Sequence, residues 1–170
     1  NCALDTSGAL ECWGYDGDSR VSGAPSSGTY MVVSAGSYHS CVIDTVGAIT
    51  CWGDDSYDQV TDVPTGTFTQ IVQGVKHSCA LDTDGAVQCW GDDTYSQVSD
   101  TPSGVFLKLS ASHLNTCGLD TSGQVTCWGD DSDGQVSDVP ELDTGGVGDL
   151  VCTIDTESFD EDGDAITYTF

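Results

Sequence analysis

The chain has 170 residues, 28 Asp and Glu against 3 Lys and Arg, a formal net charge of −25 and a pI near 4.1. This balance argues against nucleic acid and anionic membranes as partners, because both require a basic protein surface. The apolar runs are too short for a transmembrane helix, so we expect no membrane insertion. With 38% hydrophobic residues, 4 Trp and 6 Tyr, the chain nevertheless has enough apolar surface to fold.

The nine cysteines follow a regular pattern. Eight of them form four pairs separated by ten positions, without the CxxC spacing of zinc sites: Cys2 and Cys12, Cys41 and Cys51, Cys79 and Cys89, Cys117 and Cys127. This pattern predicts four structural disulfides and an oxidising compartment, hence an exported protein with an extracellular or cell-surface location. We expect its signal peptide to lie outside the chain shown. The ninth, Cys152, has no predicted partner within the chain.

The cysteine pairs belong to an internal repeat. The first cysteine of each pair recurs in steps of 39, 38 and 38 residues, and a tryptophan follows each second cysteine: Trp13, Trp52, Trp90 and Trp128. Repetition at a fixed period is the signature of propellers and solenoids. We predict four units over residues 1–141, at about 1–38, 39–76, 77–114 and 115–141.

Each unit contains a predicted β-hairpin. In the second unit, pairing Cys41 with Cys51 sets Ile43 opposite Ile49 and leaves residues 45–47 as the loop. A three-residue loop favours a left-handed last residue, and glycine occupies that position in every unit: Gly8, Gly47, Gly85 and Gly123. The preceding aspartates are expected to cap these turns through their carboxylates: Asp5, Asp44, Asp82 and Asp120.

The alternation of side chains predicts how the hairpins pack. Cys41 and Ile43 point to one face of the hairpin, while Val42 and Trp52 point to the other, so both faces are expected to be covered. A third strand precedes each of the last three hairpins, and no segment shows helical periodicity. The sequence therefore predicts an all-β, propeller-like array of about four small antiparallel blades, or a solenoid.

The repeated string resembles a known family. The sequences His-Ser-Cys, Asp-Thr-x-Gly, Cys-Trp-Gly-Asp-Asp and Gln-Val recur in phase over residues 1–141 and resemble the regulator of chromosome condensation repeat. The spacing and the segment containing Val63, Pro64, Gly66 and Phe68 are most similar to short secreted bacterial versions, such as the β-lactamase-inhibitor propeller. The resemblance implies a β-propeller used mainly as a scaffold for protein binding. Arg20 departs from the repeat, since the other units have Gln59, Gln97 and Gln135 there.

Propellers of this family usually have about seven blades, whereas four hairpins are present here. Either the chain is a fragment of a longer protein, or an open propeller completes itself by assembly with another chain. In the second case the first hairpin, which lacks a preceding strand, would offer an exposed edge to another strand.

The repeat ends near residue 141. We expect a Gly-rich linker over 142–148 and, over 149–170, a short β segment that resembles the start of a bacterial immunoglobulin-like or cadherin-like module. Two strands cannot form such a sandwich alone, so Cys152 would pair with a cysteine beyond residue 170 or in another chain. Alternatively, these strands pack on a neighbouring subunit.

Calcium is the predicted cofactor. Asp160, Asp162 and Asp164 alternate through a Gly-containing loop and would supply the hard oxygen ligands that calcium prefers. The paired aspartates after each Trp-Gly are weaker candidates, and a solvated acidic loop is the favoured interpretation for them: Asp54 and Asp55, Asp92 and Asp93, Asp130 and Asp131.

No catalytic arrangement is recognisable. His39 and His77 share one repeat position, so we expect them to form structural hydrogen bonds between blades, while His113 is out of register and expected to be exposed. The tryptophans fit core packing better than a sugar-binding platform. There is no GxSxG motif. We therefore predict no enzymatic activity.

Two functions compete. The first is a non-catalytic extracellular structural protein, a segment of a surface or filament-forming polypeptide that self-associates or joins other surface proteins. The second is a secreted protein-binding module, inhibitor-like or adhesin-like. The loops after the hairpins are near copies of one another. This favours the structural protein, because the loops of a specific binding face are expected to differ in sequence.

Overall fold

The computed structural model describes residues 1–140 and contains eleven strands in that part of the chain. They are β1 (Cys2–Leu4), β2 (Leu10–Cys12), β3 (Tyr30–Ala35), β4 (His39–Asp44), β5 (Ile49–Gly53), β6 (Phe68–Gln73), β7 (His77–Asp82), β8 (Val87–Gly91), β9 (Phe106–Ala111), β10 (Asn115–Asp120) and β11 (Val125–Gly129). One 3₁₀ turn, η1 (Gly17–Ser19), follows the first hairpin. The predicted linker at 142–148 and the β segment at 149–170 lie outside the described residues.

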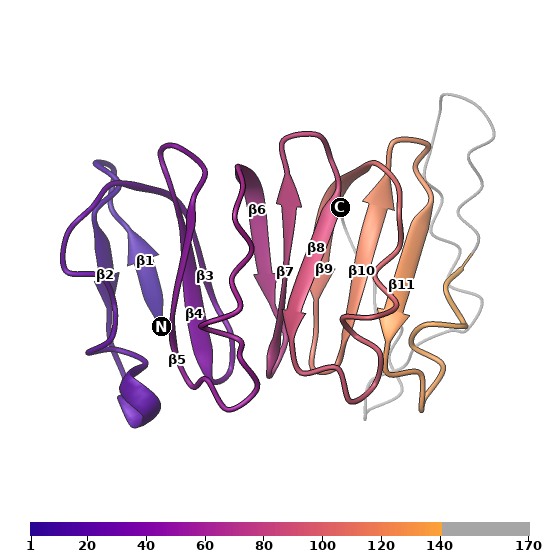
Figure 1. The fold of residues 1–170 in the computed structure, drawn as a ribbon, viewed down its shortest axis with the longest axis horizontal. Coiled ribbons are helices and arrows are strands. Elements are labelled where there is room, and N and C mark those ends of the chain that lie inside the picture. Colours follow the sequence, from indigo (N-terminus) through magenta and orange to yellow (C-terminus); the bar gives the residue numbers. More distant parts are fainter. Residues whose placement is uncertain (141–170) are drawn as a thin grey trace, which may run out of the picture.

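The strands form four separate antiparallel sheets that stand side by side along the long axis of the molecule (Figure 1). The first sheet pairs β1 with β2, and the others have the orders β3-β4-β5, β6-β7-β8 and β9-β10-β11. The predicted all-β array of small antiparallel blades is confirmed. Within residues 1–140 the array is open.

The hairpins have the register that their cysteines predict. Cys41 lies opposite Cys51 and Ile43 opposite Ile49. Gly47 closes the loop with a φ of +88°, a conformation that glycine adopts without strain. The Asp44 carboxylate accepts hydrogen bonds from the amides of Val46 and Ala48, both at 2.9 Å, which is the predicted turn cap.

Each of the four cysteine pairs forms a disulfide between directly opposed strands. The Cα atoms are 4.1 Å apart in the first three bridges and 4.0 Å apart in the fourth. Each bridge therefore joins the equivalent pair of residues in its hairpin, and its sulfur atoms lie on one face of the sheet.

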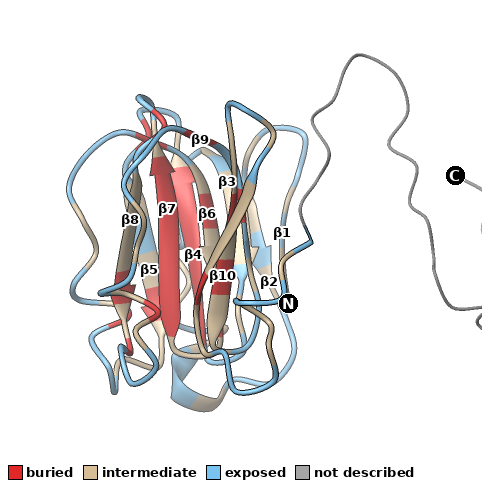
Figure 2. Cartoon of the chain, turned by 90° about the vertical axis from the view of Figure 1, so that its right-hand side faces the viewer, coloured by how far each residue is buried: buried red, intermediate tan, exposed pale blue. Residues whose placement is uncertain are grey.

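The core lies between the sheets. The disulfide face of one sheet packs on the aromatic and aliphatic face of the next: Cys41 and Ile43 contact a cluster with Phe68, Ile71 and Trp90. The next junction repeats this arrangement with Cys79, Leu81, Phe106, Leu109 and Trp128. Burial is greatest in β4 and β7, the middle strands of the two inner sheets (Figure 2). The expectation that both hairpin faces are covered is confirmed for these sheets.

Candidate binding face

The loop after each of the last three hairpins is closed by a glutamine, which is buried in the first two of these loops. The Gln59 side chain is inaccessible to solvent, donates a hydrogen bond to Asp54 Oδ2 at 2.8 Å, and accepts one from the Tyr57 amide at 2.8 Å. The Asp55 carboxylate accepts from the amides of Val60 and Thr61 at 2.8 and 3.1 Å. We call this arrangement the Asp-Gln clasp.

The clasp recurs with the same partners in the next two units. Gln97 bonds to Asp92 and to the Tyr95 amide, and Gln135 bonds to Asp130 and to the Asp133 amide. The paired aspartates considered as weaker calcium candidates thus accept loop hydrogen bonds. Sequence analysis missed this role, although the constant spacing of five residues between the first Asp and the Gln was a visible signal.

Hydrogen bonding keeps Asp93, the second aspartate of the clasp that contains Gln97, ionised. Burial acts to raise the pKa of Asp93, but hydrogen bonds from Ser99 and the Val98 amide outweigh it and lower the pKa. An ionised carboxylate is the stronger acceptor, so Asp93 stabilises its loop most when it is charged.

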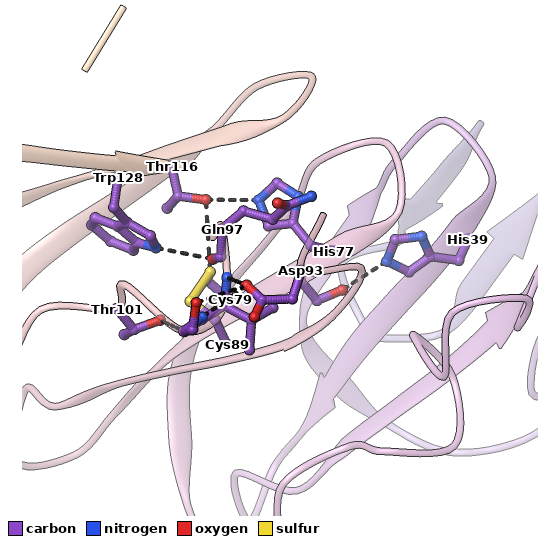
Figure 3. Close-up of a disulfide and its surroundings, with 12 residues drawn as sticks. His39, His77, Cys79, Cys89, Asp93, Gln97, Thr101, Thr116 and Trp128 are labelled. Carbon is purple, nitrogen blue, oxygen red and sulfur yellow. Dashed lines mark hydrogen bonds between the residues drawn. A yellow bond between two sulfur atoms is a disulfide. The ribbon is translucent and has the colours of Figure 1, made fainter. Parts of the chain in front are cut away.

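A ladder of tryptophan hydrogen bonds joins neighbouring sheets. Trp90 Nε1 donates to the Gln59 carbonyl at 3.0 Å. Trp128 Nε1 donates to the Gln97 carbonyl at 3.2 Å (Figure 3). Both tryptophans are buried, as is Trp52. The clasp of one unit thereby fixes the position of the next sheet.

The first tryptophan differs from the other three. Trp13 is 53% exposed, so the expectation of core packing is wrong for this residue. The cause is positional: within residues 1–140, no sheet lies on the outer side of the first hairpin to cover its indole.

The two repeated histidines connect sheets, as predicted. His39 Nε2 is 2.7 Å from Ser78 Oγ, and His77 Nε2 is 2.8 Å from Thr116 Oγ1 (Figure 3). Burial lowers the pKa of each imidazole to about 4, so both are neutral near pH 7. His113 is exposed, as expected.

Tyrosines and cations line one end of the array. We call Tyr15, Tyr38, Tyr57 and Tyr95, together with Arg20 and Lys76, the tyrosine row; its four tyrosines are 39–79% exposed. They lie in two sets of loops at the same end of the sheets, because the Asp54 amide donates to the Tyr38 carbonyl and the Asp92 amide to the Lys76 carbonyl.

Two of the chain's three cations are held on these rings. The Arg20 guanidinium lies 4.7 Å from the centre of the Tyr38 ring and 5.4 Å from that of Tyr15. Lys76 Nζ lies 4.2 Å from the centre of the Tyr57 ring. Arg20, the departure from the repeated glutamine, also offers its carbonyl to Trp52 Nε1 at 2.9 Å, so it keeps the ladder intact while adding a cation to the row.

Four predicted site residues belong to the C-terminal part of the chain. Cys152, Asp160, Asp162 and Asp164 lie outside the described residues, and calcium binding there stays a prediction. Within residues 1–140, no three His, Cys, Asp or Glu side chains come close enough to hold a metal ion together. The same residues contain no helix of the length and hydrophobicity needed to cross a membrane.

The fold and its junctions define a repeat protein of the β-propeller class. The chain belongs to the regulator of chromosome condensation (RCC1) repeat family, whose pattern matches residues 33–59, 68–97 and 106–135, about half of its length. This confirms the resemblance predicted from the sequence at the level of the family. Closeness to the short secreted bacterial versions stays a prediction.

Two receptor ectodomains are similar in structure. The CRINKLY WD40 ectodomain of the Arabidopsis thaliana receptor kinase ACR4 is 27% identical with a TM-score of 0.63, over 75% of this chain and 46% of that one. The ectodomain of the Physcomitrella patens receptor kinase CR4 is 29% identical with a TM-score of 0.65, over 75% and 38%. Disulfides and ectodomain relatives are both consistent with an extracellular location.

A third structure shares the fold alone. Prp20p from Saccharomyces cerevisiae, described with its binding to Gsp1p and histones, is 18% identical with a TM-score of 0.62, over 96% of this chain and 47% of that one. The chain therefore spans less than half the length of each of these structures. None of the curated proteins matches it.

Proposed function

We propose that this chain is a non-catalytic extracellular scaffold that binds another protein through the tyrosine row. The observation that carries the proposal is the concentration of exposed tyrosines and two of three cations at one end of a strongly acidic molecule. Tyrosine and arginine are the residues most enriched at protein interfaces, because each combines a large apolar area with a polar group.

The near-identity of the loops does not oppose this function. Their repeated Asp and Gln residues form the clasp, so they are copied for structural reasons. The position before each middle strand does vary, from Tyr38 and Lys76 in the tyrosine row to Leu114 in the fourth sheet. The loops therefore keep the residues of the clasp and differ at this position.

The net charge indicates the character of the partner. At −25 the molecule attracts basic proteins over distances comparable to the screening length of the solution. We expect the association rate to fall as salt is added, while the tyrosines determine how long the complex lasts.

Capture of extracellular proteins tests the proposal. The oxidised chain is immobilised and exposed to secreted and surface proteins of its source, and each captured protein is then titrated in pure form. The double variant Tyr57→Ser/Tyr95→Ser is expected to weaken its affinity at least tenfold, a change of about 1.4 kcal/mol. Val46→Ser, which removes an exposed side chain at the opposite end of the sheets, is the matched control. Equal affinity for both variants would refute the proposal.

Self-association into a surface filament is the second candidate. Trp13 favours it, because this indole is exposed and its N–H has no acceptor within residues 1–140, unlike its three counterparts. Sedimentation of the full chain would show concentration-dependent growth, and Trp13→Ser would abolish it. A monomer at all concentrations would exclude this role.

A further inference from the structure

The residue at the end of the first strand is alanine in two of the three complete sheets and glutamine in the other. The equivalent residues are Ala35, Gln73 and Ala111, which lie opposite Ser40, Ser78 and Thr116 in the neighbouring strands. Both polar atoms of the Gln73 side chain are buried, and neither has a hydrogen-bond partner among the described residues. An unpaired buried amide is costly, so its presence in place of alanine requires a reason.

Gln73 borders a hollow of about 350 Å³ that spans three sheets. The turns before β4, β7 and β10 form its walls through Gly36, Gly74 and Ser112, so it opens at the same end of the sheets as the tyrosine row. A Cβ atom on Gly36 would lie 2.8 Å from that of Gln73. Glycine at position 36 is therefore what allows the Gln73 side chain to lie against the neighbouring sheet.

A second side chain beside the hollow also has an unpaired polar atom. His77 Nδ1 is buried without a partner among the described residues, although Nε2 of the same ring is bonded to Thr116. The imidazole packs against Gly74, one of the residues that line the hollow. Two neighbouring side chains thus have unused hydrogen-bonding capacity here.

The molecule already shows what a glutamine can do in this setting. Gln70, in the same strand, donates from Nε2 to the Leu109 carbonyl at 2.8 Å and accepts from the Leu109 amide at 2.9 Å. One carboxamide thereby satisfies both backbone groups of a single residue in the extended strand β9. The contact is specific for extended backbone and independent of side-chain identity.

We propose that the hollow binds an extended backbone segment of the protein partner, held by the Gln73 carboxamide in the two-point manner of Gln70 and Leu109. The proposal rests on the protein-binding function and names the element of the partner that is recognised. Both amide atoms are buried in the free protein, so binding requires the Gln73 carboxamide to turn toward the hollow that the residue lines; the broad terminal torsion of glutamine permits such a rotation. Binding then supplies the hydrogen bonds that the free protein lacks.

Titration with a minimal peptide group tests the site directly. Acetyl-glycine-N-methylamide is added to the ¹⁵N-labelled full chain, and the side-chain amide resonances of glutamine are followed. We expect a saturable shift of the Gln73 side-chain signal, with smaller shifts of the Gly36, Gly74 and Ser112 backbone amides. An unchanged Gln73 signal, or the same backbone shifts in Gln73→Ala, would overturn the proposal.

The substitution Gln73→Ala provides an independent measurement, since the chain itself carries alanine at this position in two other sheets. We expect an unchanged or higher Tm, because two unpaired buried atoms are removed, together with at least tenfold weaker binding of the captured partner. Gln124→Ala, which removes an exposed carboxamide at the opposite end, should change neither. A lower Tm for Gln73→Ala would show that ordered water alone satisfies the amide, and would refute the proposal.

The two hypotheses fail in different ways. If the tyrosine variant binds the captured protein more weakly while Gln73→Ala binds it with unchanged affinity, the role of the tyrosine row is supported and the backbone-binding site is refuted. If neither variant weakens binding of the captured protein, the proposed function of the tyrosine row fails as well, because the protein then binds elsewhere on the chain.

Discussion

Gln59, Gln97 and Gln135 occupy one position of the repeat and make the same two side-chain hydrogen bonds, but they differ in environment. Gln59 and Gln97 are fully buried and their carbonyls accept a tryptophan N–H from the next sheet. Gln135 lies in the last described loop and is half-buried. The energetic contribution of a residue type is therefore set by the sheet that covers it.

Substitution of these glutamines measures that difference. Gln97→Ala leaves the Tyr95 amide and the Asp92 carboxylate without their partner in a buried loop, and we expect a loss of about 3 kcal/mol in the free energy of unfolding. Gln135→Ala removes equivalent bonds where water can replace them, and about 1 kcal/mol is expected. Urea denaturation of both variants provides the comparison, and equal losses would show that the covering sheet contributes nothing.

The hairpin is the element that the disulfides stabilise. Each bridge closes a short loop, so it lowers the entropy of the unfolded chain, and in the inner sheets its sulfur atoms also belong to the core. The bridge between Cys2 and Cys12 has the same geometry but is only half-buried.

Removal of individual bridges separates these two contributions. We expect Cys2→Ala/Cys12→Ala to lower the free energy of unfolding by about 3 kcal/mol, the chain-entropy value for a loop of this length. Cys79→Ala/Cys89→Ala should cost more, because it also leaves a cavity between two sheets. The measurement is denaturant unfolding of the oxidised proteins; identical losses would mean that the buried sulfur atoms do not contribute to packing.

At the scale of the molecule, the junctions between sheets hold the array together. The two junctions among the last three sheets combine apolar contacts with a tryptophan hydrogen bond and with a histidine bonded to a hydroxyl group of the next sheet. Desolvation keeps both imidazoles neutral. The charge of His77 lowers the pKa of His39 further, whereas the nearby aspartates act more weakly in the opposite direction: Asp54 and Asp55 raise the pKa of His39, and Asp92 raises that of His77.

The junctions therefore predict a loss of stability in mild acid. The folded-state pKa of each histidine, about 4, lies below the unfolded value near 6.5. The unfolded chain binds more protons between these values, so stability is full above pH 6.5 and falls as the pH approaches 4, by up to about 1.4 kcal/mol per pH unit for each histidine.

A matched variant isolates this effect. His77→Asn places in the third sheet the residue that the fourth sheet carries at Asn115. It should reduce the pH dependence between 6.5 and 4 by at least half, because it also removes the charge that lowers the pKa of His39. Thermal unfolding across this range is the measurement. If the variant and the parent lose stability in parallel, the histidines are not responsible for the acid sensitivity.

Much of the fold was predictable because it is local and repeated. The cysteine spacing, the glycine at position 47 and its partners in the other units, and the alternation of apolar residues together predicted the hairpins and their register. The role of His39 and His77 was also predictable, since a repeated polar residue beside a buried strand requires a repeated partner. The Asp-Gln clasp was not predicted, because the same aspartate pattern is also typical of solvent-exposed acidic loops.

The sequence by itself thus determined the repeat, the antiparallel hairpins and the disulfide positions, which depend on residues close together in the chain. Only the tertiary structure decided which equivalent residues are buried, such as Trp90, and which are exposed, such as Trp13. It also brought the tyrosines of successive loops into one row and placed Gln73 beside the turns of two other sheets. These properties depend on how sheets that are about 38 residues apart in the chain pack on one another. A local sequence pattern does not specify which residues of another sheet will cover a given side chain.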